Sequence, residues 1–128
     1  MKARNLATIA TAAVGALVLT TSPAAALAYV TPGQGLSPCP SGSVCAYLNY
    51  DLNESGSNDI LVTDQSLPDL HPYGFGDVAS SYYNHTSHYV TFYDHGDYQG
   101  AEKTVAPGAH ANFTGNWNDD LSSLKILP

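Results

Sequence analysis

An internal repeat constrains the fold of this chain more than any other feature. Residues 75–81 read FGDVASS and residues 117–123 read WNDDLSS, at an offset of 42 residues. Upstream, Tyr47 aligns with Tyr93 at an offset of 46 residues, and a glycine closely follows each tyrosine. Two anchors at nearly equal offsets predict a domain built from two copies of one supersecondary unit.

The residue types around these anchors predict β-strands. Tyrosine, valine and threonine are frequent after residue 45, while glycine, asparagine, aspartate and proline interrupt the chain at short intervals. No segment keeps a 3.6-residue apolar period. We expect strands at residues 44–48, 89–93 and 123–127, and an all-β fold.

The first 28 residues have the organisation of a signal peptide. Lys2 and Arg4 form a basic start, residues 6–19 are uncharged and largely apolar, and small residues follow. Cleavage is expected after Ala28, because Ala26 and Ala28 supply the small-residue pattern of such sites. A membrane anchor is the alternative, but the apolar run is short for a bilayer. We therefore expect a secreted, extracellular protein with no membrane segment in its mature form.

The mature chain is predicted to be a short leader and one acidic domain. Residues 29–38 are rich in proline, glycine, serine and threonine, which predicts a poorly ordered leader. Residues 39–128 suit a single domain, which we expect to be a monomer. Only Lys103 and Lys125 stand against eleven carboxylates after residue 28, a net charge of −9. Nucleic acid is therefore not an expected partner, whereas a cation or a basic protein surface suits this charge.

The two cysteines are expected to form a disulfide. Cys39 and Cys45 are an even pair, six residues apart, in a chain expected to reach an oxidising compartment. A metal site is the weaker alternative, because no further cysteine is present to complete a set of thiolate ligands.

Two segments resemble the Greek-key motif of βγ-crystallins. Residues 93–100 read YDHGDYQG, with two aromatic residues and a glycine at the spacing of that family's folded hairpin. Residues 118–123 match its calcium-loop pattern of two Asn/Asp, two variable residues and two serines. The resemblance implies a sandwich of two Greek keys with about eight strands, the first over about residues 44–88 and the second over about residues 89–127.

The first copy departs from this pattern in two places. Tyr47 and Gly56 are two residues further apart than their counterparts, and Glu54 stands where the second aromatic residue is expected. Gly76 replaces the first Asn/Asp of the calcium loop. The first hairpin is therefore expected to be looser, and the first loop to lack one side-chain oxygen.

Two other segments resemble the Streptomyces-type metalloproteinase inhibitor family, which has a crystallin-like fold. They are residues 39–45, CPSGSVC, and residues 104–109, TVAPGA. That family braces a reactive loop with a second disulfide, whereas this chain has no third or fourth cysteine. The corresponding region falls near residues 93–99, where we expect a hairpin. The resemblance implies a non-enzymatic protein that binds a secreted protease.

Calcium is the ligand that the crystallin resemblance implies. In such loops the Asn/Asp pair, the following backbone carbonyl and the first serine supply oxygens, and the two copies exchange ligands. The candidate ligands are Asn118, Asp119, Asp120 and Ser122 in the second loop, and Asp77, Val78 and Ser80 in the first. The alternative is that each loop is only a capped turn before a strand, with its polar side chains bonded to local amides.

Other chemistries receive little support from the sequence. His85 and His88 are three residues apart, which on a strand places them on opposite faces, so surface histidines are favoured over a zinc site. Neither serine pair lies in a Gly-x-Ser-x-Gly motif. No catalytic residue is assigned. Two hypotheses follow: a secreted crystallin-like peptidase inhibitor that acts by binding, or a calcium-binding structural or stress-protective crystallin without inhibitory activity.

Overall fold

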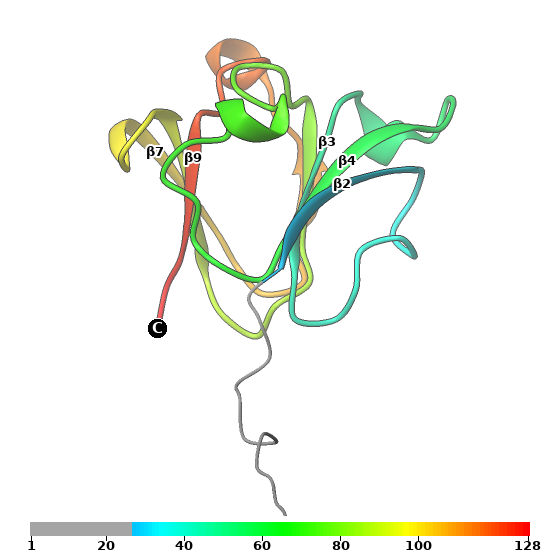
Figure 1. The fold of residues 1–128 in the computed structure, drawn as a ribbon, viewed down its shortest axis with the longest axis horizontal. Helices are drawn as coiled ribbons and strands as arrows, with labels where there is room; N and C mark the ends of the chain where they lie inside the picture. Colours follow the sequence, from blue (N-terminus) through cyan, green and yellow to red (C-terminus); the bar gives the residue numbers. More distant parts are fainter. Residues whose placement is uncertain (1–26) are drawn as a thin grey trace, which may run out of the picture.

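A computed structural model describes residues 27–128 as two antiparallel β-sheets, and residues 1–26 of the predicted signal peptide lie outside it (Figure 1). The strands are β2 Ala28–Gly33, β3 Val44–Tyr47, β4 Asn58–Thr63, β5 Ser81–Asn84, β6 Val90–His95, β7 Gln99–Val105, β8 His110–Asn112 and β9 Ser123–Ile126. Three short 3-10 helices lie in connections of the described part: η3 Asp51–Asn53, η4 His71–Tyr73 and η5 Gly115–Trp117. The all-β prediction is confirmed. Within residues 27–128 no helix has the length and apolar character that crossing a bilayer requires.

The two halves of the chain exchange one extended segment each. The larger sheet has the strand order β2-β4-β3-β5-β8, and the smaller sheet has the order β7-β6-β9. β8 comes from the second half but pairs with β5 of the first half. Conversely, Leu67 of the first half forms an isolated antiparallel bridge with Leu124 of β9. The predicted pair of Greek keys is therefore present, and the two copies interlock.

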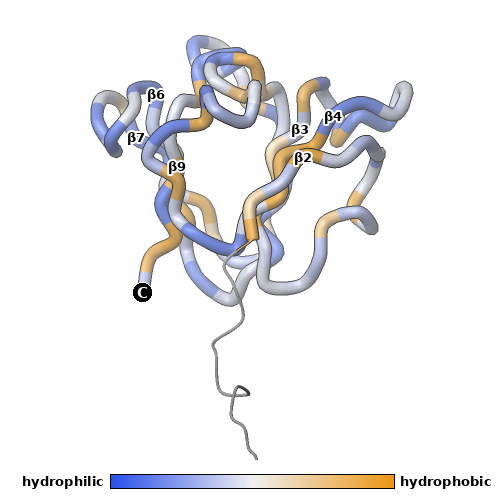
Figure 2. Tube along the Cα trace, viewed as in Figure 1, coloured by the Kyte–Doolittle hydropathy of each residue, from blue (hydrophilic) through white to orange (hydrophobic). Residues whose placement is uncertain are grey.

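The main hydrophobic core lies between the two sheets. Tyr82, Phe92 and Phe113 contact one another there, with ring centroids 5.0 to 5.2 Å apart. They come from β5, β6 and the segment after β8, so the core joins both copies. Figure 2 shows hydrophobic residues along β4 and β9, which border this core from opposite sheets.

A second hydrophobic cluster lies on the outer face of the larger sheet. Side chains alternate along β3, so Val44 and Ala46 face the main core while Cys45 and Tyr47 face outward. The cluster contains Cys39, Cys45, Tyr47, Leu52, Ile60 and Val62. The Tyr47 hydroxyl donates a 2.7 Å hydrogen bond to the carbonyl of Gly35, which holds the preceding segment against this face.

The expectation of a poorly ordered leader over residues 29–38 is wrong. Strand β2 occupies residues 28–33 and pairs with β4 in continuous register, from Ala28 opposite Thr63 to Gly33 opposite Asn58. The pairing covers an edge of β4 that would otherwise be open. The proline and glycine residues that indicated disorder are tolerated because β2 is itself an edge strand.

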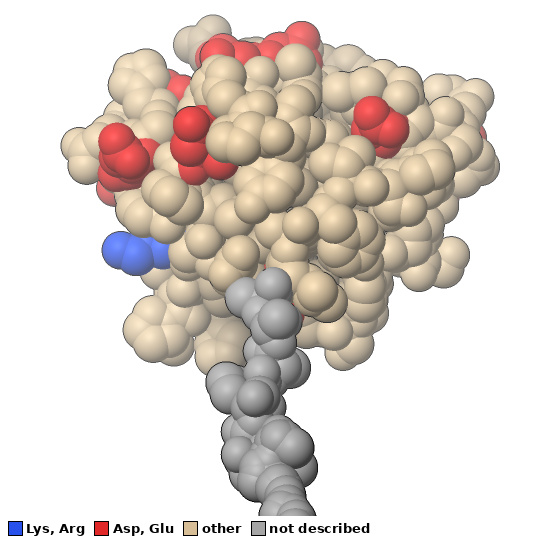
Figure 3. Space-filling view, in the orientation of Figure 1, with Lys and Arg blue, Asp and Glu red and all other residues tan. Residues whose placement is uncertain are grey.

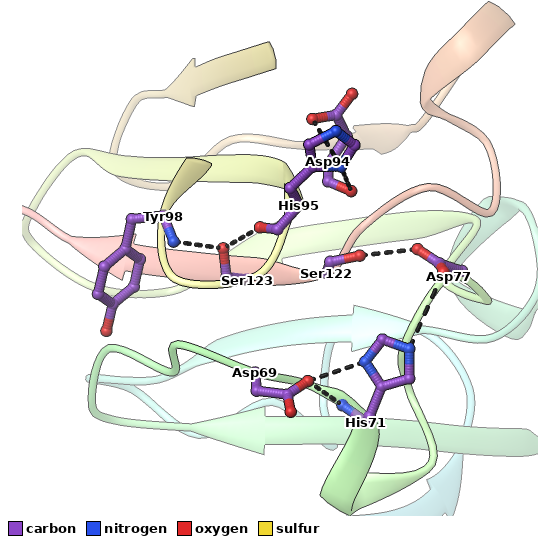
Figure 4. Close-up of polar contacts among 8 residues, drawn as sticks. All are labelled: Asp69, His71, Asp77, Asp94, His95, Tyr98, Ser122 and Ser123. Atoms are coloured by element: carbon purple, nitrogen blue, oxygen red, sulfur yellow. Dashed lines mark hydrogen bonds and ion pairs between the residues drawn. The ribbon is translucent and has the colours of Figure 1, made fainter. Parts of the chain in front are cut away.

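A serine fixes the folded hairpin of the second copy. The rings of Tyr93 and Tyr98 meet edge to face, with centroids 5.8 Å apart, in the hairpin that the aromatic spacing predicted. The Ser123 hydroxyl accepts a 3.1 Å hydrogen bond from the Tyr98 backbone N–H and donates one of 2.7 Å to the His95 carbonyl (Figure 4). This hydroxyl therefore ties the turn between β6 and β7 to the start of β9.

In the first hairpin, Ser81 has the role that Ser123 has in the second. The Ser81 hydroxyl accepts a 3.1 Å hydrogen bond from the Leu52 backbone N–H and donates one of 2.7 Å to the Asn49 carbonyl. Leu52, and not Glu54, therefore occupies the position of the second aromatic residue. The alignment failed because residues 51–53 all have left-handed backbone conformations, which shift the register of the turn.

Candidate functional site

The two predicted calcium loops lie against each other at one end of the sandwich. We call residues 76–80 and 118–122 the loop pair. The Asp77 backbone N–H donates to the Leu121 carbonyl at 2.9 Å, and the Asp119 N–H donates to the Ala79 carbonyl at 3.1 Å. Asp77 and Asp119 both have left-handed conformations, with φ of 60° and 63°. The loops are thus docked reciprocally, as two equivalent parts of one site.

The serine of each loop contacts the aspartate of the other. The Ser122 hydroxyl donates to Asp77 Oδ1 at 2.7 Å (Figure 4), and the Ser80 hydroxyl donates to Asp119 Oδ1 at 3.3 Å. The structure therefore brings together four of the predicted ligands in two crossed pairs. Val78 is partly buried and Asp120 is exposed, and neither side chain joins these pairs.

The second loop has an oxygen with no hydrogen-bond partner. Oδ1 of Asn118 is buried and accepts no hydrogen bond. Its Nδ2 donates weakly to Asp119 Oδ2 at 3.4 Å. A buried acceptor without a donor is destabilising unless a ligand satisfies it. Together with Asp119 and Ser80, this oxygen fits a hard cation such as calcium, which takes carboxylate, amide and hydroxyl ligands.

In the first loop, the imidazole ring of His71 lies where the Asn/Asp side chain that is missing at Gly76 would begin. A Cβ at Gly76 would collide with the ring of His71 in its present position, so any larger residue there would have to displace the ring. The ring is anchored by Asp69, whose Oδ1 accepts from the His71 backbone N–H at 2.9 Å and contacts Nδ1 at 2.8 Å (Figure 4). The backbone bond, and then the ring, hold the pKa of Asp69 below its usual value. Sequence reasoning missed His71, because no motif links it to the loop.

The loop pair lies at an acidic end of the molecule. Figure 3 shows carboxylates gathered over the upper part of one face, where the loop pair and the β6–β7 turn lie in Figure 1. The Asp97 backbone N–H donates to the Pro68 carbonyl at 2.8 Å, which fixes that turn beside the segment that carries Asp69. This end therefore has a negative potential that attracts cations.

The opposite end of the sandwich is braced by the disulfide. Cys39 and Cys45 are bonded as predicted, with Cα atoms 5.9 Å apart. The Gly42 N–H donates to the His85 carbonyl at 2.8 Å, and His85 Nδ1 lies 2.9 Å from the Cys39 carbonyl oxygen. The disulfide ring is thus fixed to the segment that follows β5.

Asn84 joins this segment to a third one. Its Nδ2 donates to the His88 carbonyl at 2.8 Å and to the Ala106 carbonyl at 3.1 Å, and the Gly108 N–H donates to the Asn84 carbonyl at 2.7 Å. We call residues 39–45, 84–89 and 105–109 the disulfide end. The two segments that resemble the inhibitor family are therefore neighbours in space. The disulfide end carries no Asp, Glu, Lys or Arg.

His85 and His88 have different surroundings. The ring of His85 stacks on Tyr83, with centroids 4.8 Å apart, and His88 is exposed. Within residues 27–128, no three His, Cys, Asp or Glu side chains converge as a metal-binding group. The same part of the chain forms no pocket.

Comparison with solved structures shows the fold. A structure solved to study the evolution of the eye lens βγ-crystallin domain fold is 21% identical, with a TM-score of 0.63 over 76% of this chain and 97% of the other. A βγ-crystallin from Ciona intestinalis is 27% identical, with a TM-score of 0.56 over 67% of this chain and 100% of its own. Spherulin 3a from Physarum polycephalum is 21% identical, with a TM-score of 0.57 over 77% of this chain and 93% of its own.

Comparison at the level of sequence shows the family. No protein of curated function is significantly similar to the chain as a whole. The profile of peptidase inhibitor family I36 matches residues 33–105, which include the disulfide, the first Greek key and the β6–β7 hairpin. The chain belongs to peptidase inhibitor family I36 and has a βγ-crystallin fold.

Proposed function

We propose that this protein is a secreted, monomeric peptidase inhibitor that acts by binding its target and not by catalysis. Membership of family I36 is the observation that carries this proposal. The basic start, apolar run and small residues of the first 28 positions support secretion. A metalloproteinase is the target class that the resemblance to the Streptomyces-type inhibitors favours.

The disulfide end is the surface that we assign to the peptidase. Its segments are held to one another by the disulfide and by the bonds of Asn84 and His85, so they lose little conformational entropy on binding. It also lacks fully charged side chains, and the centres of protein interfaces are depleted of charge.

The β6–β7 turn is less suited to the role of a reactive loop. A segment that binds like a substrate along a peptidase cleft is extended. Asp97 and Tyr98 instead have left-handed conformations, with φ of 58° and 59°. The turn is also tied down through Ser123 and Pro68. Extending it would break these bonds.

Inhibition assays test this proposal. The protein should inhibit at least one member of a panel of thermolysin-like and serine peptidases at micromolar concentration. Ser41→Trp, on the exposed part of the disulfide ring, should weaken inhibition, whereas Ser55→Trp, exposed at the other end, should not. No inhibition of any peptidase rejects the function. Loss with Ser55→Trp alone rejects the assigned surface.

A second candidate function is that of a calcium-stabilised extracellular protein. The partnerless Asn118 Oδ1 favours it. Weak binding is expected, with a dissociation constant of roughly 10⁻⁴ to 10⁻³ M, as in other extracellular modules. Calcium should raise the thermal midpoint, and Asp119→Ala should abolish the increase. An equal increase in protein and variant would reject this function. The two functions are compatible, because calcium would further rigidify an inhibitor.

A further inference from the structure

The two halves of the loop pair differ in the hydrogen bonds that their side-chain oxygens accept. In the first loop, Asp77 Oδ1 accepts a short 2.7 Å bond from Ser122, and its Oδ2 faces Nε2 of His71 at 3.9 Å. In the second, the bonds to Asp119 are 3.3 and 3.4 Å long, and Asn118 Oδ1 has no partner. Asp77 Oδ2 also has no donor within hydrogen-bond distance, but of the two loops only the second has a buried oxygen without a partner.

The connection before the first loop is one residue longer than the connection before the second loop, and this difference accounts for the position of His71. The Leu70 N–H donates to the Ser122 carbonyl at 3.0 Å, and the Phe113 N–H makes the equivalent 2.9 Å bond to the Ser80 carbonyl. Leu70 lies six residues before Gly76, whereas Phe113 lies five residues before Asn118. The first connection therefore contains one additional residue. It places the imidazole ring where a side chain at position 76 would lie.

We propose that this chain has one calcium site and not two, and that His71 closes the second. The site consists of Asn118 and Asp119 from the second loop with the Ser80 hydroxyl from the first. At the first loop, His71, anchored by Asp69, occupies the space beside Gly76 that corresponds to the position of Asn118 in the second loop. Asp77 therefore accepts a hydrogen bond from Ser122 and does not serve as a calcium ligand. This inference rests on the proposed calcium binding.

Stoichiometry and position of binding test the inference on the purified protein. Calcium titration calorimetry gives the number of sites. Terbium luminescence sensitised by Trp117, the only tryptophan, reports the site next to Asn118. We expect one equivalent of calcium and strong sensitised emission that calcium displaces. Two equivalents of similar affinity would overturn the inference but leave calcium binding intact. No saturable binding would overturn both.

Charge-matched variants locate the site. Asn tolerates left-handed backbone, so Asp→Asn changes charge without straining Asp77, Asp97 or Asp119. Asp119→Asn should weaken calcium binding about tenfold or more, since it removes a carboxylate ligand. Asp77→Asn should change affinity by less than about threefold, close to the effect of Asp97→Asn, which removes a charge from the β6–β7 turn. Equal losses in the Asp77 and Asp119 variants would overturn the inference.

Removing the imidazole of His71 should open a calcium site at the first loop. The double variant His71→Ala/Gly76→Asn frees the space beside the first loop and supplies the missing amide oxygen. It should bind a second equivalent of calcium, whereas His71→Ala alone should still bind one. A double variant that is folded by circular dichroism but retains one equivalent would contradict the role given to His71.

Discussion

The hydroxyl of Ser122 donates a 2.7 Å hydrogen bond to Oδ1 of Asp77, which lies 45 residues earlier in the chain. The corresponding pair, Ser80 and Asp119, is separated by 3.3 Å. Both serines are buried, and both loops are otherwise joined by matching backbone bonds. The internal repeat is thus symmetric in its backbone and asymmetric in its polar side chains.

This asymmetry predicts that two equivalent substitutions lower the free energy of unfolding by different amounts. In the presence of a chelator, Ser122→Ala should lower the free energy of unfolding by about 1 to 2 kcal/mol, because it removes a short bond to a carboxylate. Ser80→Ala should cost less than about 0.5 kcal/mol, because its bond is long. Urea unfolding measures both, with Ser55→Ala as the exposed control. Equal costs would show that the crossed pairs are equivalent in solution.

The sequence predicted the repeat, the class of fold and three strands because these depend on local pattern. Strands expected at 44–48, 89–93 and 123–127 are observed as β3, β6 and β9, with small differences at their ends. The disulfide was predictable because only two cysteines exist and they are close in the chain. The hydrogen bonds from Ser122 to Asp77 and from Ser80 to Asp119 show that the two loops contact each other through exchanged side chains, whereas calcium ligation stays a prediction.

The features that were missed depend on contacts between distant segments. Strand β2 was not predicted because Pro32 and Gly33 indicate a loop, and only pairing with β4 makes the segment a strand. Leu52 was misaligned because the left-handed run at residues 51–53 cannot be read from residue spacing. His71 was overlooked because its relation to Gly76 is one of space and not of sequence.

Asn84 should be essential to the disulfide end. Its side chain is buried, donates to the carbonyls of His88 and Ala106 and more weakly to that of Val105, and accepts through Oδ1 from the Thr86 N–H and hydroxyl. Asn84→Ala leaves these groups unpaired and should lower the free energy of unfolding by about 2 to 4 kcal/mol. Asn116→Ala, at an exposed position, should change it by less than about 0.5 kcal/mol. Denaturant unfolding of both variants tests this, and similar small effects would contradict the role of Asn84.

The disulfide should contribute modestly to stability. It closes a ring of only seven residues, so the loss of loop-closure entropy in the unfolded state corresponds to about 2 kcal/mol. Cys39→Ala/Cys45→Ala should therefore unfold at lower denaturant concentration while remaining folded at room temperature. Chemical reduction of the unmodified protein is the matched control and should give a similar loss. A double variant that fails to fold at all would show that the ring also directs the packing of the outer cluster.

Tyr47 should make stability fall in strong base. Burial, and then the neighbouring Tyr83 and Glu54, raise the pKa of Tyr47 to about 12, whereas an unfolded tyrosine has a pKa of about 10. Only the unfolded state ionises between these values. Stability from this residue is therefore complete below about pH 10 and decreases by about 2 to 3 kcal/mol as the pH approaches 12. Tyr47→Phe removes the bond to Gly35 and should be about 1 kcal/mol less stable at neutral pH, yet lose less stability in base. Urea unfolding from neutral pH to about pH 11 compares the slopes for protein and variant. Parallel slopes would mean that the Tyr47 hydroxyl reaches water in the native protein.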